Sequence, residues 1–313
     1  MSENRGAVEV WRGSVATWEC DAMGHMNIRF YVSRAMEGLA GLAAALGLPD
    51  AFTARAASTL LVREHHIRFL REARADAPLY MEAGVVEMGE TDALLLQVLR
   101  HSVSGEPAAT LLTRVAHASP GAGQVFAWPK RFRAAAEKLR VDIPDFAAPR
   151  GIDGGPVQSV ASRERAEAMG VLCGARGAVM PAECDVFGRM RPEMAMGRMS
   201  DGMSFLLQTL NDTVAKAAPE LASRFGGAAL EYRLIYLELP KTGAGLEVRS
   251  SGVAITPKLR RARHWLLDAA SGRPWAVAEV LAANFDLVAR KVIAAPPAVI
   301  EAFAGLQRPD MPL

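Results

Sequence analysis

The spacing of hydrophobic positions changes several times along the chain, and each change predicts a different element. Residues 8–18 are rich in β-branched and aromatic side chains, which is typical of a strand, and we expect a bend at Gly13. From Met26 onward, large apolar residues recur at helical spacing until Gly47 and Pro49. This pattern predicts a long, largely buried helix that ends at these two residues.

Residues 58–118 alternate between apolar and polar positions, and short turn-like segments interrupt them. In STLLVREHHIRFL, Leu61 and Ile67 fall on the apolar face. Arg63 and His65 fall on that face too, so the alternation is imperfect. GETD and SGEP, which separate the later runs, have the composition of hairpin turns. A strand, a long helix and several antiparallel strands, in that order, predict a sheet that wraps around the helix.

A nine-residue pattern occurs twice, as ECDAMGHMN at 19–27 and as ECDVFGRMR at 183–191. The matching residues lie 164 positions apart and include the Glu-Cys-Asp triplet, one glycine and one methionine. Further pairs follow at the same offset or at 167: Arg34 with Arg198, Gly38 with Gly202, Glu64 with Glu231, Gly105 with Gly272, and Pro107 with Pro274. An offset that changes once, within a predicted loop, indicates a duplicated domain.

We therefore expect residues 1–118 to form a first repeat and residues 159–313 to form a second one. Residues 119–158 differ from both, because they are rich in Pro and Gly and contain one amphipathic segment, WPKRFRAAAEKLR. This stretch is predicted to be a linker with one short docked helix that starts at Pro129.

Composition limits the classes of function. The net charge of +2 is almost neutral, which argues against nucleic acid as the main partner. Three cysteines without a CxxC pair indicate neither a disulfide framework nor a zinc site, and we expect neither a metal nor a cofactor. MSENRGAVEVWRG lacks the apolar stretch of a signal peptide, and no run of about 18 apolar residues predicts a membrane span. The expected location is cytoplasmic.

The segment DAMGHMN at 21–27 resembles a motif of a known enzyme family. It is similar to the D-x-x-G-H-[VM]-N segment at the helix entrance of hotdog-fold acyl-CoA thioesterases of the 4-hydroxybenzoyl-CoA thioesterase type. GHMNIRFYV together with REHHIRFLREA is similar to thioesterase modules fused to carnitine dehydrogenases. The resemblance covers residues 8–118 well and residues 170–290 more weakly. It implies an α+β fold, a tandem double hotdog in which each repeat wraps an antiparallel sheet around a long central helix.

The resemblance implies hydrolysis of an acyl-CoA or acyl-carrier thioester to a free acid and a thiol. Asp21 would be ionised at neutral pH, since free Asp has a pKa near ~3.9, and it can act as a base or as a nucleophile. The backbone amides of Gly24 and His25, where we expect the helix to begin, would polarise the thioester carbonyl. His25 would also position groups or carry a proton, and Asn27 would hold the water or orient Asp21.

Each of these residues also has a structural interpretation. An Asp before a helix is often an N-cap, and Asn27 is a common turn residue. Glu64 and His66, on the strand face opposite Ile67, are either secondary site residues or part of a solvated face. Four cations cluster only in the second repeat: Lys258, Arg260, Arg261 and Arg263. They suit the phosphates of coenzyme A, although solvated charge on an exposed hairpin is the commoner reason for such a cluster.

The second copy of the motif keeps Asp185 but has Arg189 where His25 stands and Arg191 where Asn27 stands. We therefore predict one working site per chain, built on Asp21, with a scaffold role for the second repeat.

Two other functions stay open: a non-catalytic acyl-CoA-binding or assembly protein, and a hotdog hydratase or dehydratase. The Asn-Pro-x-His helix entrance usual for the latter does not occur. The acyl group is not determined. A quaternary ammonium group would need an aromatic cage, for which four residues are available: Trp18, Phe30, Tyr31 and Phe69. Hotdog domains often associate, and the sequence leaves open whether two chains pair.

Overall fold

The computed structural model describes residues 6–21 and 23–313, apart from the side chains of Ser204 and Phe205. Residues 1–5, on which the expectation about a signal peptide partly rests, lie outside the described residues. No helix in the described part of the chain is long and apolar enough to cross a membrane.

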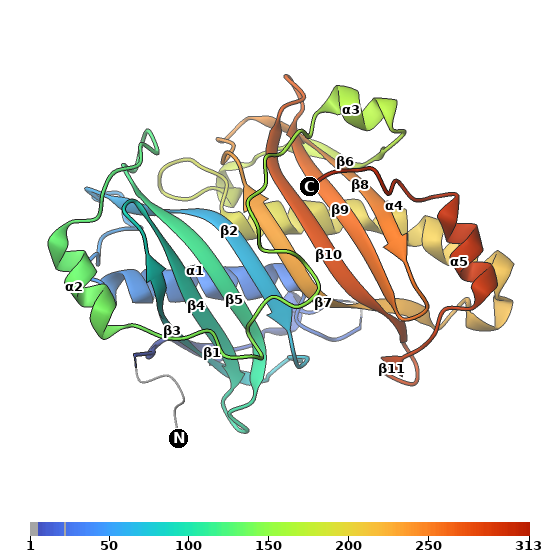
Figure 1. The fold of residues 1–313 in the computed structure, drawn as a ribbon, viewed down its shortest axis with the longest axis horizontal. Helices are drawn as coiled ribbons and strands as arrows, with labels where there is room; N and C mark the ends of the chain where they lie inside the picture. Colours follow the sequence, from blue (N-terminus) through green and yellow to red (C-terminus); the bar gives the residue numbers. More distant parts are fainter. Residues whose placement is uncertain (1–5, 22) are drawn as a thin grey trace. The chain divides into compact units, whose positions relative to one another are not determined.

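The chain divides into two compact units (Figure 1). Unit 1 comprises residues 1–149 and 182–196, so it includes the second copy of the nine-residue pattern. Unit 2 comprises residues 150–181 and 197–313.

Unit 1 contains a sheet and a long helix that packs on one of its faces. The elements are β1 (Val8–Ser14), the 3-10 turn η1 (Thr17–Glu19), α1 (Ile28–Ala45), β2 (Thr59–Phe69), β3 (Pro78–Met88), β4 (Asp92–His101), β5 (Pro107–Ala118) and α2 (Lys130–Lys138). The strands are antiparallel, in the order β1-β3-β4-β5-β2. Val32, Ala35, Leu39 and Leu42 of α1 are fully buried. Because they recur at helical spacing, they place one continuous apolar stripe on the core.

The predicted long helix is confirmed, with sharper ends. Asn27 is its N-cap and accepts a hydrogen bond from the Arg29 amide at 3.0 Å. The helix therefore begins at Ile28, just after Gly24 and His25 rather than at them. Gly47 follows the last turn with a φ of 88°, a conformation that glycine adopts without steric cost.

A β-bulge explains the imperfect alternation of β2. Val62 pairs with Val115, but Glu64 pairs with the adjacent Arg114, so Arg63 has no partner position on β5. The extra residue shifts the alternation by one position, and His65 becomes fully buried. A strict two-residue alternation that ignores the bulge therefore assigns the residues after Arg63 to the wrong face of the sheet.

The segment after α2 covers the other face of the unit 1 sheet. Val141 and Ala147 pack on Leu96, Val98 and Leu112, which point away from α1. The stretch predicted to be a linker therefore contributes to the core of unit 1 from Val141 onward.

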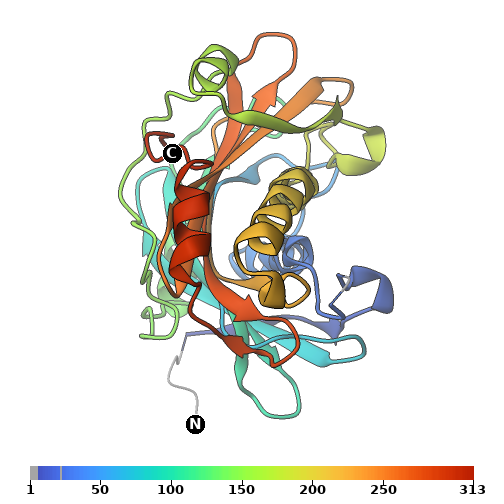
Figure 2. The same cartoon turned by 90° about the vertical axis from the view of Figure 1, so that its right-hand side faces the viewer.

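Unit 2 repeats this arrangement. Its elements are α3 (Arg163–Ala168), β6 (Leu172–Ala178), η3 (Pro219–Leu221), β7 (Phe225–Tyr236), β8 (Gly245–Ile255), β9 (Leu259–Asp268), β10 (Pro274–Asp286), β11 (Lys291–Val292) and α5 (Pro297–Ala304). The turn η2 (Pro181–Glu183) and helix α4 (Pro192–Ala217) begin the second repeat. The strand order is β7-β10-β9-β8-β6, with β11 beside β10. From Gly197 onward, α4 lies along one face of this sheet (Figure 2).

The two sheets share one register at the offset of 167. Val62 pairs with Val115 in unit 1, and Ala229 pairs with Ala282 in unit 2. Both β2 and β7 have a bulge at the equivalent position, Arg63 and Leu230. The strand-helix-sheet order, the strand order and the register all repeat, so the predicted double hotdog is confirmed.

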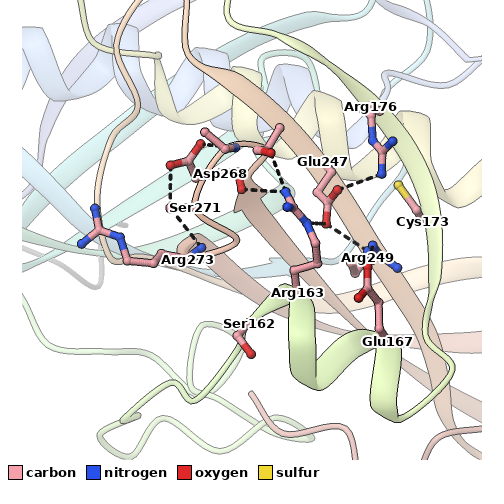
Figure 3. A network of polar contacts seen from close by, with 12 residues as sticks. Ser162, Arg163, Glu167, Cys173, Arg176, Glu247, Arg249, Asp268, Ser271 and Arg273 are labelled. Atoms are coloured by element: carbon pink, nitrogen blue, oxygen red, sulfur yellow. Dashed lines mark hydrogen bonds and ion pairs between the residues drawn. The ribbon is translucent and has the colours of Figure 1, made fainter.

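A buried carboxylate ties the start of unit 2 to its sheet (Figure 3). Glu247 on β8 accepts hydrogen bonds from Arg163 at 3.0 Å, Arg249 at 3.1 Å and Arg176 at 3.1 Å. Burial by itself would raise the pKa of the Glu247 carboxyl, but the hydrogen bonds from Arg163 and Arg249 outweigh it and hold the pKa below 4.5. The stabilisation is therefore present above pH 4.5 and is lost as the pH falls through the lowered pKa.

Replacing Glu247 by Gln is expected to destabilise the protein by about 2 kcal/mol at pH 7, because three guanidinium groups lose one shared charge. Urea denaturation at pH 7 and at pH 3 measures the effect, which should shrink at the lower pH. Glu167→Gln is the control: its carboxylate is mostly exposed and contacts Arg249 alone, at 3.3 Å. Equal losses in the two variants would contradict a central role for Glu247.

Candidate active site

Asp21 organises the turn between η1 and α1. Its Oδ1 accepts hydrogen bonds from the amides of Met23 at 2.8 Å and His25 at 3.2 Å. Its own amide donates to the carbonyl of His25 at 2.8 Å, and its carbonyl accepts from Gly24 at 3.0 Å. Gly24 has a φ of 77°, which closes the turn. Asp21 is thus held by its own loop and does not cap α1.

The second carboxylate oxygen of Asp21 contacts no hydrogen-bond donor or cation among the residues that the structure describes. The side chain is exposed. One oxygen therefore fixes the orientation of the carboxylate, while the other is open to a substrate or a water molecule.

His25 makes a close contact with a carboxylate that sequence reasoning missed. Its Nε2 lies 3.2 Å from Oε2 of Glu72, a residue 47 positions further along the chain. The segment after β2 carries Glu72 to this place, because the Met26 amide donates to the Ala73 carbonyl at 2.8 Å and His25 pairs with Arg74. The imidazole is nearly buried, whereas Glu72 is more than one-third exposed. A carboxylate on Nε2 keeps a proton on that nitrogen and fixes the ring orientation.

Tyr31 closes the inner side of the turn. It is buried and packs edge-on against Phe69, with ring centroids 5.1 Å apart. Burial raises the pKa of its hydroxyl to about 12, and the nearby carboxylates of Glu72 and Asp21 add to the rise. Tyr31 is therefore a neutral hydroxyl at the site at any pH in which the protein works.

The repeated Glu19 has a structural role. Its buried carboxylate pairs with Arg34 and accepts the Ala16 amide at 2.9 Å, and its carbonyl accepts the Asn27 amide at 2.8 Å. Glu19 and Arg34 thus join η1 to α1. Glu183 and Arg198 stand at the equivalent positions of the second repeat, where the Arg191 amide donates to the Glu183 carbonyl at 2.9 Å.

The second copy forms the same turn and closes it. Oδ1 of Asp185 accepts the amides of Phe187 at 2.9 Å and Arg189 at 3.0 Å, and Gly188 has a φ of 74°. The Arg189 guanidinium then donates to Oδ2 at 3.1 and 3.0 Å. Arg189 replaces His25, so the oxygen that is open in Asp21 is occupied and its charge is neutralised in Asp185.

The second repeat has lost Glu72 as well. At the offset of 167, the hydrogen bonds of Leu70 and Arg71 to Ala108 recur as those of Leu237 and Glu238 to Trp275. The position of Glu72 is therefore taken by Leu239. Aligning the two repeats would have pointed to Glu72, because the second repeat has lost both His25 and Glu72.

The paired glycines allow a matched test. Nothing lies within 4 Å of a Cβ added at Gly24 or at Gly188, so alanine there costs only backbone strain. Both Gly24→Ala and Gly188→Ala are expected to destabilise the protein by about 1 kcal/mol. Only Gly24→Ala should lower kcat/KM, because only that turn presents an open carboxylate. Urea denaturation and a thiol-release assay measure the two effects; equal activity loss would contradict the one-site prediction.

The remaining candidates lie elsewhere on the fold. Glu64 and His66 are on β2, where His66 is buried and Glu64 half-buried, and each makes contacts. Arg261 and Arg263 both reach Glu279, at β10, and bond the carbonyls of Gly151 and Met311. Lys258 is exposed, whereas Arg260 points to the opposite sheet face from Arg261. The structure does not gather these four cations on one surface.

Comparisons with known proteins agree with this description. The family model of the thioesterase-like superfamily matches residues 15–136. A comparison with curated protein sequences gives no match.

Three solved structures resemble nearly the whole chain. A protein assigned as an oleoyl thioesterase from Lactobacillus plantarum has a TM-score of 0.65 at 13% identity, over 89% of this chain and 96% of its own. An acyl-ACP thioesterase from Bacteroides thetaiotaomicron has a TM-score of 0.61 at 10% identity, over 90% of this chain and 100% of its own. The 12:0-ACP thioesterase from Umbellularia californica has a TM-score of 0.60 at 10% identity, over 89% of this chain and 94% of its own. These likenesses extend over both repeats, and at such identities they concern the fold.

The family match covers the segment that holds the Asp21 turn, α1 and Glu72, and the structural likeness covers both repeats. Residues 15–136 thus match the thioesterase-like superfamily, and the chain has the double-hotdog fold.

Proposed function

We propose that the protein hydrolyses an acyl-CoA or acyl-carrier thioester at the Asp21 turn of the first repeat. The observation that carries the proposal is the difference between the two copies. The first has an open carboxylate oxygen beside a His25–Glu72 pair, whereas the second has lost all three features. Residues that only shape the turn are kept in both copies, so the residues kept in one copy are best explained by chemistry.

The open oxygen of Asp21 suits either of two routes. As a base, it takes a proton from water, the water oxygen bonds to the thioester carbon, and the carbon–sulfur bond breaks to release a thiolate. As a nucleophile, it bonds to the carbon itself, the thiolate leaves, and water then hydrolyses the mixed anhydride. In both routes the thiolate recovers a proton, and Glu72 would hold His25 in the orientation that supplies it.

The carbonyl oxygen needs donors as its negative charge develops. The amides of Gly24 and His25 are proposed for this role, although both now donate to Asp21. The His25 bond, at 3.2 Å, is longer than the 2.8 Å bond of Met23 to the same oxygen. It is therefore the one that a thioester oxygen would most readily replace.

The proposal is tested by thiol release from a panel of acyl-CoA and acyl-carrier thioesters. The panel contains short, long, aromatic and betainyl acyl groups. The expected result is turnover of at least one ester by the wild type. After a single turnover in ¹⁸O-water, ¹⁸O in the Asp21 carboxylate would identify the nucleophile route with attack of water on the Asp21 carbonyl of the anhydride, because the base route leaves Asp21 unlabelled.

Two other outcomes would overturn the proposal. Tight acyl-CoA binding without thiol release would indicate a binding or assembly protein. A change in acyl unsaturation without thiol release would indicate a hydratase or dehydratase.

A further inference from the structure

The inner faces of the two sheets are filled differently, although their strands share one register. In unit 1, five aliphatic side chains on the face toward α1 are each at most 2% exposed: Leu60, Val62, Val85, Leu95 and Val115. The equivalent residues of unit 2 are all glycine or alanine: Gly227, Ala229, Gly252, Ala262 and Ala282. Five neighbouring positions have thus lost aliphatic volume, which in a well-packed core is destabilising unless something else fills the space.

In the part of α4 whose side chains the structure describes, two residues that face the sheet do not compensate for this loss. Gly202 meets Val248 as Gly38 meets Met81, which confirms that α4 and α1 share one register on their sheets. Met203 and Leu206 of α4 then correspond to residues of α1 that are fully buried, but both are partly exposed. At these two positions, α4 is therefore less closely packed on its sheet than α1 is in unit 1.

One large polar residue enters this region. Arg260 stands at the position of Ala93, four residues before His264 on an unbroken stretch of β9. His264 stacks on Tyr232, whose hydroxyl contacts Sδ of Met199 on α4, so Arg260 faces α4 as well. Its Nη1 is buried and has no partner in the described part of unit 2. A Cβ at Gly227 would overlap the guanidinium, so this glycine makes room for it.

No ion-pair partner of Arg260 lies among the residues that the structure describes. Burial lowers the pKa of the guanidinium to about 10, so it still carries a full charge at pH 7. Arg260 is partly exposed but its Nη1 is buried, and a largely desolvated cation without a counter-ion is costly. The neighbouring Arg261 and Arg263 show the usual solution, since both pair with Glu279.

We propose that the inner side of unit 2 binds an amphiphilic carboxylate, with the carboxylate on Arg260 and an apolar chain over the glycine and alanine positions. A guanidinium matches a carboxylate in charge and in paired hydrogen-bond geometry. The positions that have lost volume are aliphatic in unit 1, so the bulk of the ligand is apolar and only its end is anionic. This site is separate from the Asp21 turn, and its binding does not require hydrolysis.

Titration calorimetry with laurate tests the proposal on wild type, Arg260→Gln and Lys258→Gln. Lys258 is an exposed cation two residues away and serves as the matched control. Arg260→Gln is expected to weaken one laurate site per chain about 10- to 100-fold, while Lys258→Gln leaves it within two-fold. Ala229→Val combined with Ala262→Leu, which restores the unit 1 residues, should abolish the same site. Urea denaturation confirms that each variant is folded.

A diazirine-bearing dodecanoate locates the site independently. Labelling of α4 or of β7–β10 is expected, and Arg260→Gln should remove it. Labelling confined to residues 15–136, equal weakening by both cation variants, or no laurate binding by the wild type would overturn the proposal. Inorganic phosphate is the second probe: if it displaces laurate at equal concentration, the site is a general oxyanion site and the assigned apolar chain is wrong.

Discussion

Asp21→Asn is expected to lower kcat for thioester hydrolysis by at least about 10³-fold while the protein stays folded. The amide side chain keeps an oxygen that can accept the Met23 and His25 amides, so the turn is preserved. It loses the negative charge and the basic oxygen on which both routes depend. Thiol release under saturating substrate measures kcat, and circular dichroism with urea denaturation checks folding.

Asp185→Asn is the matched control, because Asp185 occupies the same turn in the second copy. Its activity should stay within two-fold of the wild type, since Arg189 already occupies the second carboxylate oxygen. Loss of activity in Asp185→Asn with full activity in Asp21→Asn would place the site in the second copy and contradict the proposal.

Glu72→Gln is expected to lower kcat/KM by about 10²-fold, the range typical of a lost acid–base arrangement. Glutamine keeps the size of the side chain but removes the carboxylate oxygen that lies 3.2 Å from Nε2 and orients His25. Thiol release measures kcat/KM, and urea denaturation should show that the variant keeps most of its stability. A merely structural role for Glu72 would lower stability while kcat/KM of the folded protein stays near that of the wild type.

The double variant His25→Gln/Glu72→Gln tests whether the two residues act as one unit. Its loss should be close to that of His25→Gln alone, because Glu72 acts through His25. Glu106→Gln is the control for a surface carboxylate: Glu106 pairs with Arg71, next to Glu72, at 2.6 Å and is well exposed. Additive losses in the double variant would show that Glu72 acts independently of His25.

Local patterns in the sequence predicted much of the fold. The helix from Met26 to Gly47, the turns GETD and SGEP, and the duplicated nine-residue pattern all have counterparts in the structure. Each of these signals is carried by residues that are close in sequence, such as a helical stripe, a turn composition or a constant offset. Such signals depend little on which distant segments pack against them, so they can be recognised without the tertiary structure.

The tertiary structure decided the rest, because it depends on which distant residues are brought together. Glu72 reaches His25 only through the path of the chain after β2, and the Arg63 bulge changes the faces of that strand. The sequence shows that Arg189 replaces His25, but only the structure shows that its guanidinium donates to the second carboxylate oxygen of Asp185.

The same limit applies to the cations of the second repeat. Arg261 and Arg263 point to one face of β9, and Arg260 points to the other, toward the inner side of unit 2. The sequence by itself determined the double hotdog and the turn that carries Asp21. Only side-chain contacts between distant segments decided which groups surround that carboxylate and which charge is left unpaired, because such contacts depend on register and loop path rather than on local spacing.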